Sequence, residues 1–93
     1  MSVALPEICW FLGIKIEVHW KDHPPPHVHA SFGKDKAALR IDNGEVIAGS
    51  LPPKILSQVR DWLKERNGEV MAAWDNAAQM QAPSKVLPPE GMY

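Results

Sequence analysis

The chain contains little cysteine, no long apolar run and almost no excess charge, and each shortage argues against a class of protein. The single cysteine, Cys9, cannot form an intrachain disulfide. No apolar stretch approaches the roughly 20 residues needed to cross a bilayer, and no secretory leader is recognisable. A formal net charge of −1 gives no overall attraction to nucleic acid or to anionic lipid. We therefore expect a cytoplasmic protein without a membrane partner.

The usual catalytic signatures are missing as well. The sequence has no G-x-S-x-G, phosphate-binding loop, dinucleotide fingerprint or H-E-x-x-H. The common hydrolase, NTPase and dehydrogenase classes therefore lose their usual support.

The 93 residues are 45% hydrophobic and include four tryptophans, which is enough for one small core and too little for two domains.

The sequence does contain a concentration of histidine. All four histidines lie in the eleven residues from His19 to His29, and three consecutive prolines, residues 24–26, stiffen the link between them. Imidazole titrates near neutral pH and is the commonest metal ligand in proteins. The segment therefore predicts a functional site, although it does not specify the reaction.

Alternating apolar residues predict four strands in a meander. The first runs from Ile8 to Trp20, with a bulge expected near Gly13, and the second covers residues 27–32. The third covers residues 36–42. It is joined to the fourth by a type I′ turn at Asn43-Gly44, which would place Leu39 opposite Ala48.

Two helices follow the strands in this interpretation. Pro52 and Pro53 suit the first turn of a helix whose apolar residues share one stripe, and Asn67-Gly68 ends or kinks it. A second helix is expected over residues 69–81. We therefore predict an α+β domain, residues 1–81, in which both helices pack on one face of a four-stranded antiparallel sheet. Residues 82–93 are expected to form a proline-rich, loosely ordered tail.

The predicted hairpin loop at residues 22–26 would gather the histidines. It pairs Trp20 with Val28 and sets His19 opposite His29. His19, His27 and His29 then share the outer face of the sheet, while His23 lies at the loop end. Directly opposed side chains are about 5 Å apart at Cβ, so three imidazoles could converge on one ion.

One interpretation of this cluster is a site for zinc, nickel or iron. Asp22 or Glu17 would orient an imidazole or complete the shell. The alternative has equal weight: the prolines shape the loop and the histidines are only polar residues on a solvated face. The metal ligands that we predict are His19, His23, His27 and His29.

A second interpretation is acid–base catalysis without a metal. One imidazole would act as base and another as acid, for example in cleaving RNA through its own 2′-hydroxyl, while a cation holds the phosphate. The candidate catalytic residues are His23, His27 and His29. The candidate phosphate contacts are Lys21 and Arg40, with Lys36 as a further cation.

The string Asp22-His23-Pro24-Pro25-Pro26-His27-Val28-His29, followed by Asn43-Gly44-Glu45-Val46 and by Trp62 and Trp74, resembles the bacterial family called domain of unknown function 4160. The resemblance covers about Ile8 to Gln81. Its motif falls on Asp22, His23, Pro25, Pro26, His27 and His29, whereas His19 lies outside it. The resemblance implies a small protein partner encoded nearby, in a toxin–antitoxin-like pair of genes.

Three functions therefore stay open at the level of sequence. The first is an interaction or regulatory module that binds its partner through a sheet edge, the open sheet face or the tail, with a homo-oligomer through the sheet edge as a variant. The second is a metal-dependent or histidine-dependent enzyme acting on RNA or another phosphodiester. In the third, the loop only determines the fold.

Overall fold

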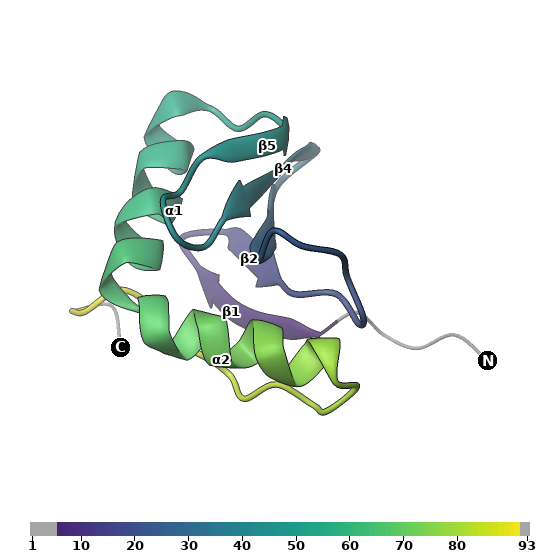
Figure 1. Cartoon of the computed structure of the whole chain (residues 1–93). Helices are drawn as coiled ribbons and strands as arrows, with labels where there is room; N and C mark the ends of the chain where they lie inside the picture. Colours follow the sequence, from purple (N-terminus) through teal and green to yellow (C-terminus); the bar gives the residue numbers. More distant parts are fainter. Residues whose placement is uncertain (1–5, 92–93) are drawn as a thin grey trace.

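The structure is a computed structural model that describes residues 6–91 as an antiparallel sheet followed by two helices (Figure 1). The strands follow one another in the sheet in chain order, as a meander. The α+β prediction is confirmed, but the sheet has five strands where we predicted four. The elements are β1 (Glu7–Phe11), β2 (Ile14–Glu17), β3 (His27–Phe32), β4 (Asp35–Arg40), β5 (Val46–Gly49), α1 (Pro53–Glu65) and α2 (Asn67–Ala78).

The additional strand arises from a tight turn inside the segment that was predicted as one strand. Leu12 and Gly13 have φ values of 51° and 77°, and Phe11 lies opposite Ile14. Two successive left-handed residues form the type of turn that best matches the twist of a hairpin. The even-numbered residues from Ile8 to Trp20 are all apolar, so periodicity alone could not reveal the reversal, although the turn moves burial from Cys9 and Phe11 to Ile14 and Ile16. Gly13 is therefore part of a turn, not of the bulge that we expected.

The register between β2 and β3 also differs from the prediction. Ile16 lies opposite Ala30 and Glu17 opposite His29, a shift of two residues from the expected pairing. β2 ends at Glu17, so the connection to β3 is longer than the five residues that we assumed. A shift by an even number keeps each side chain on its face, because side chains alternate with a period of two.

The pairing between β4 and β5 also differs from the prediction. Leu39 lies opposite Val46 and Ala38 opposite Ala48, with an irregularity between them. Of the predicted turn residues, only Gly44 has a positive φ, of 73°. The loop is wider than a two-residue turn and is closed by a hydrogen bond of 2.8 Å from the Arg40 amide to the Glu45 carbonyl.

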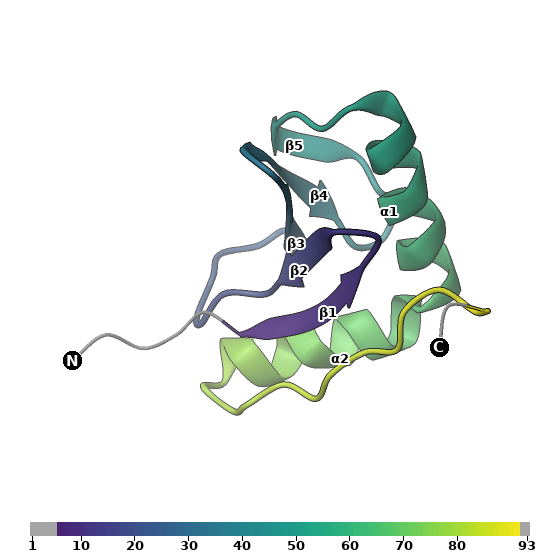
Figure 2. The same cartoon turned by 180° about the vertical axis from the view of Figure 1, so that it is seen from behind.

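The helices cover the apolar face of the sheet. α1 begins at the two prolines, as predicted, and the Asn67-Gly68 pair begins α2. Figures 1 and 2 show α1 beside β4 and β5, and α2 beside β1. One core cluster joins the inward residues of the strands to Trp62 and Trp74. Trp10 lies outside this core cluster and is 52% exposed.

The segment after α2 lies along β1 and α1. The Val86 amide donates a hydrogen bond of 2.7 Å to the Ile8 carbonyl, and the Val86 side chain is buried. The indole of Trp62 donates to the Leu87 carbonyl at 2.9 Å, and Arg66 donates to the Pro88 carbonyl. This part of the predicted tail therefore covers the edge of β1, while residues 92–93 lie outside the described range.

Candidate metal centre

The loop between β2 and β3 is attached to the rest of the fold at both ends. The Lys21 amide donates a hydrogen bond of 3.1 Å to the Ala77 carbonyl at the end of α2. At the other end, the Ile41 amide donates to the Pro26 carbonyl at 3.0 Å. Between these points the three prolines leave few alternative conformations. The attachment and the prolines together fix where Asp22 and His23 lie.

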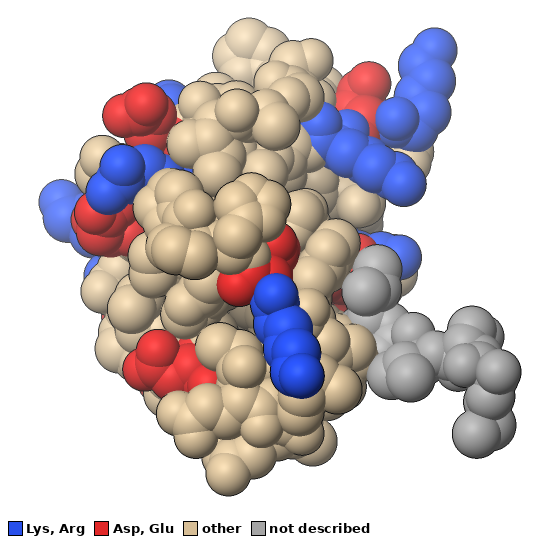
Figure 3. Space-filling model, turned by 45° about the vertical axis from the view of Figure 1, so that its right-hand side comes forward, with Lys and Arg blue, Asp and Glu red and all other residues tan. Residues whose placement is uncertain are grey.

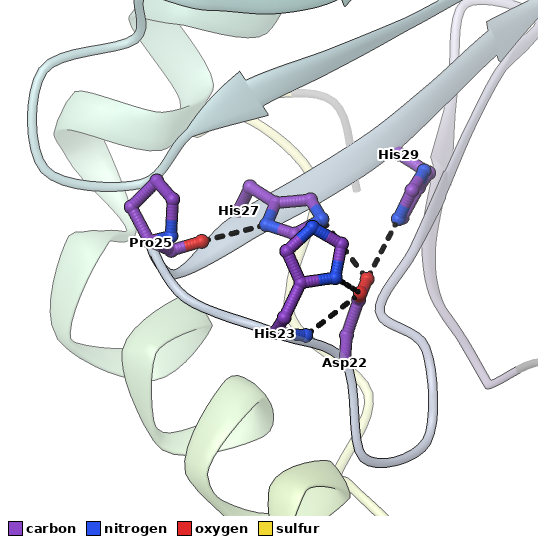
Figure 4. Close-up of polar contacts among 5 residues, drawn as sticks. All are labelled: Asp22, His23, Pro25, His27 and His29. Atoms are coloured by element: carbon purple, nitrogen blue, oxygen red, sulfur yellow. Dashed lines mark hydrogen bonds and ion pairs between the residues drawn. The ribbon is translucent and has the colours of Figure 1, made fainter.

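Asp22 is the centre of the histidine cluster, and three imidazoles point at its carboxylate (Figure 4). The Nε2 atoms of His27 and His29 lie 2.9 and 3.1 Å from Oδ2. Nδ1 of His23 lies 3.1 Å from Oδ1, which also accepts the His23 backbone N–H at 2.9 Å. The Asp22 side chain is only 13% exposed, so these contacts replace most of its hydration.

These contacts determine the ionisation of Asp22. Burial acts to raise its pKa, but the hydrogen bonds from His29 and the His23 amide, with the charges of His27 and His29, outweigh burial and lower it. The pKa therefore lies below its ordinary value, and the carboxyl group is ionised at neutral pH. An ionised carboxylate only accepts hydrogen bonds, so each of the surrounding nitrogens must donate to it.

Both ring nitrogens of His27 contact oxygen atoms of the loop, and one of these oxygens belongs to the Asp22 carboxylate. Its Nδ1 lies 2.6 Å from the Pro25 carbonyl and its Nε2 lies 2.9 Å from Asp22, so both nitrogens face acceptors. Both nitrogens are therefore occupied by contacts within the protein. The side chain is 5% exposed and its ring packs 5.1 Å from that of Trp74. The His27 ring is thus fixed by contacts on both of its nitrogens and by its packing against Trp74.

His19 and His29 form a stacked pair beside Asp22. Their rings are parallel to within 3°, with centroids 3.5 Å apart. Nε2 of His19 is buried and has no hydrogen-bond partner among the described residues. Burial first, and then the charge of His29, lower the pKa of His19. His19 is therefore neutral at pH 7, which is the form that binds metal ions.

His19, Asp22 and His29 each offer one ligand atom, and these atoms lie within 4.8 Å of one another. His29 Nε2 and Asp22 Oδ2 are 3.1 Å apart, so an ion bound by both would replace the hydrogen that His29 donates in the metal-free chain. At bond lengths of about 2.0–2.1 Å, that separation corresponds to an angle of about 100° at the metal. Two imidazoles and one carboxylate are a donor set suited to zinc, nickel or iron.

The other candidate residues lie around this centre in different ways. The His23 side chain is 86% exposed and lies outside the convergent group. Glu17 lies opposite His29 across the strands and 3.9 Å from Lys15. Arg40 is held by Asp42 through two hydrogen bonds, of 2.9 and 2.7 Å. Lys21 is exposed, and its backbone anchors the loop.

A pocket of about 300 Å³ adjoins the stacked histidines on the outer face of the sheet. Ala38, Ala48 and Gly49 supply small residues to it, a feature that the sequence patterns did not indicate because such residues carry no chemical signature. Basic and acidic residues are interspersed in the view of Figure 3, and neither sign covers it. The pocket is lined by Glu17, His19, His29, Ser31, Lys36, Ala37, Ala38, Ala48 and Gly49.

A comparison with protein-family models matches residues 13–75 to the family described as domain of unknown function DUF4160. The chain belongs to this family. The match includes the whole Asp22 to His29 string and both helices as far as Asp75. No curated protein and no solved structure matches the chain. Within residues 6–91, neither helix has the length and apolar character that a membrane span requires.

Proposed function

We propose that this DUF4160 protein binds a divalent transition metal through His19, Asp22 and His29 and uses it to hydrolyse a phosphodiester, with RNA as the first candidate. The observation that carries the proposal is the buried Nε2 of His19, which has no hydrogen-bond partner within residues 6–91. Its ring stacks on that of His29 beside an ionised carboxylate. Leaving such a nitrogen unpaired costs about 1–3 kcal/mol, which a bound ion would offset. A cytoplasmic setting is part of this proposal.

The surrounding residues suit a catalytic site better than a structural one. Structural zinc sites are closed by four protein ligands, whereas catalytic sites have three and leave a position for water or substrate. The metal would supply an activated water and polarise the phosphoryl oxygen. His27 holds the carboxylate of Asp22 in place, and Lys36, in the adjoining pocket, offers a positive charge to a phosphate.

The proposal is tested by measuring metal content and affinity in protein without a polyhistidine tag. We expect about one zinc, nickel or iron ion per chain by elemental analysis, and a Co²⁺ derivative with ligand-field absorption bands. His19→Phe keeps a flat ring on His29 but removes the ligand, and should weaken binding at least tenfold, as should Asp22→Asn.

His23→Ala is the matched control, because it removes an exposed imidazole of the same loop from outside the convergent group. It should bind metal about as well as the parent protein. Equal affinity in the parent, His19→Phe and Asp22→Asn proteins would show that these residues are not the ligands. If the protein binds metal but does not cleave an RNA oligonucleotide in a metal-dependent way, the metal site is supported and the hydrolase activity is contradicted.

A second candidate function, an interaction module of a toxin–antitoxin-like gene pair, is favoured by the two edges of the sheet. The edge of β1 is covered by the segment around Val86, whereas β5 is an outer strand with the uncharged sequence Val46–Gly49. Ile47 on this strand is 41% exposed. An uncharged edge strand can accept a strand from a protein partner or from a second copy of the chain.

Co-expression with the product of a neighbouring gene tests this second function. A complex should elute as one peak in size-exclusion chromatography, and Ile47→Lys should separate it by charging the edge. The control is Leu12→Lys, which charges an exposed apolar residue in the turn at the opposite end of the sheet order. Two separate peaks at micromolar concentration would remove the interaction through β5.

A further inference from the structure

A row of side chains crosses the outer face of the sheet beside the metal centre. Trp10 on β1 lies opposite Lys15 on β2. Lys15 lies opposite Ser31 on β3, and Ser31 opposite Lys36 on β4. Side chains that lie directly opposite each other on neighbouring strands share a face, and Ser31 shares the face of His29 because the two are two residues apart on one strand. We call these four residues the tryptophan row.

Trp10 presents an indole ring at the β1 end of this row. It is 52% exposed, whereas Trp62 is completely buried and Trp74 is 7% exposed. Trp10 lies outside the core cluster, so the packing of the core does not account for its position. An exposed tryptophan on a sheet offers a flat surface on which a base can stack, because every base has a π-face. The β1 end of the row is therefore suited to an unpaired base.

The remainder of the row is positively charged. Lys15 and Lys36 lie on the two strands that flank β3, so their backbones are about 10 Å apart, and none of the four residues of the row is acidic. The carboxylate of Glu17 lies 3.9 Å from the Lys15 ammonium group, and the two side chains are 14% and 36% exposed. A partly exposed pair at this distance contributes little, so Lys15 can exchange it for a phosphate.

An aromatic platform followed by two cations matches a single strand better than a duplex, because paired bases are stacked on one another and leave only phosphates to contact. From these observations we infer that the tryptophan row binds a single-stranded nucleic acid, with a base stacked on Trp10 and phosphates at Lys15 and Lys36. Ser31 is about 6.8 Å along β3 from His29, so the bound strand passes beside the metal centre. The inference rests on the proposed function in one respect, because RNA is the strand that the metal centre is proposed to cleave.

Fluorescence anisotropy with a labelled RNA strand of about ten nucleotides, in buffer with EDTA, tests the inference. Trp10→Ala should weaken binding at least about fivefold, whereas Trp10→Phe, which keeps an aromatic ring, should retain most of the affinity. Lys15→Ala should reduce the slope of log K against log salt by about 0.7, because one phosphate contact is lost. The controls are Lys34→Ala, in the turn between β3 and β4, and Leu87→Ala, which removes an apolar side chain that is 50% exposed. Both should bind like the parent protein.

A duplex of the same sequence is the control ligand. It should bind more weakly than the single strand and lose nothing on Trp10→Ala, because its bases are not available to the indole. Equal affinity for the single strand and the duplex would overturn the inference. So would single-strand binding that Trp10→Ala leaves unchanged in a protein with the parent's circular dichroism spectrum. If that substitution instead alters only the oligomeric state in size-exclusion chromatography, Trp10 belongs to an interface between copies of the chain and the inference is wrong.

The outcomes separate this inference from the metal proposal, because the titration is made without metal. Metal binding without binding of a single strand would overturn the tryptophan row alone, and single-strand binding by a protein that takes up no metal would overturn the metal centre alone. A DNA strand of the same sequence distinguishes the two sources of a single strand. Stacking and phosphate contacts do not use the 2′-hydroxyl, so RNA and DNA should both bind, and binding of DNA alone would contradict RNA as the substrate.

Discussion

The two faces of the sheet differ in how strongly the sequence determines them. The inner face consists of large apolar side chains, such as Ile14, Ile16 and Val28, which are completely buried with Trp62 in one core. The outer face carries the cluster of His19, Asp22 and His29 and a pocket floored by alanines. To predict the inner face, it is enough to know which alternate residues of each strand point inward. To predict the outer face, the cross-strand partner of each residue must also be known.

The largest expected difference in stability is between substitutions of a buried and of an exposed tryptophan. Trp62 is fully buried, with its ring centroid 5.7 Å from that of Phe11, whereas Trp10 is 52% exposed. Trp62→Ala should lower the free energy of unfolding by about 3–5 kcal/mol, enough to unfold much of so small a domain. Trp10→Ala should lower it by less than about 1 kcal/mol. Urea denaturation followed by circular dichroism compares them, and equal losses would contradict the assignment of the two faces.

A smaller loss of stability is expected from a substitution at the end of β5, where the backbone of Gly49 lies close to that of Lys36 in β4. Gly49 has a φ of +72°, and a Cβ atom added there would lie 2.1 Å from the Lys36 carbonyl oxygen. Gly33 also has a positive φ, of +59°, but an added Cβ meets nothing within 4 Å. Gly33→Ala should therefore cost only the strain of a left-handed residue, about 1–2 kcal/mol, and Gly49→Ala clearly more. Similar losses in urea denaturation would show that the contact with Lys36 is not rigid.

Much of the fold could be predicted from the sequence because hydrophobic periodicity reports which residues are buried. The helix that begins at Pro53 and the strand His27–Phe32 were predicted by this argument. The turn at Leu12-Gly13 was missed because apolar residues occupy every even position from Ile8 to Trp20, and because leucine rarely adopts a positive φ. The bulge between Glu7 and Cys9, where Ile8 and Cys9 are both buried, leaves no trace in the pattern either.

The grouping of the histidines could be predicted from the sequence, but their individual contacts could not. The crowding of histidines and prolines predicts that these side chains lie together, because their spacing along the chain limits their separation. The sequence could not show that His27 is occupied by the Pro25 carbonyl, or that His19 stacks on His29 although Glu17 lies opposite it. These contacts depend on the path of the loop, which is set by distant carbonyls such as that of Ala77.

The smallest expected effect is on the pH dependence of the free energy of unfolding. It arises from the outer face, because His19 and Asp22 titrate there. The pKa of His19 lies below its ordinary value of 6.5 in the folded chain, so the unfolded chain takes up this proton first. The pKa of Asp22 lies below 3.8, which adds a second uptake of the same sign. Stability should therefore decline as the pH falls below about 6.5, and again below about 3.8.

His19→Phe separates these two steps. It removes the titrating group but keeps a flat ring on His29, so the decline that begins near pH 6.5 should become smaller while the decline below pH 3.8 remains. Denaturant unfolding of the metal-free protein between pH 8 and pH 3 measures both. The His23→Ala control should retain both steps, because that side chain is 86% exposed. An unchanged decline near pH 6.5 in His19→Phe would mean that the burial of His19 does not couple its protonation to folding.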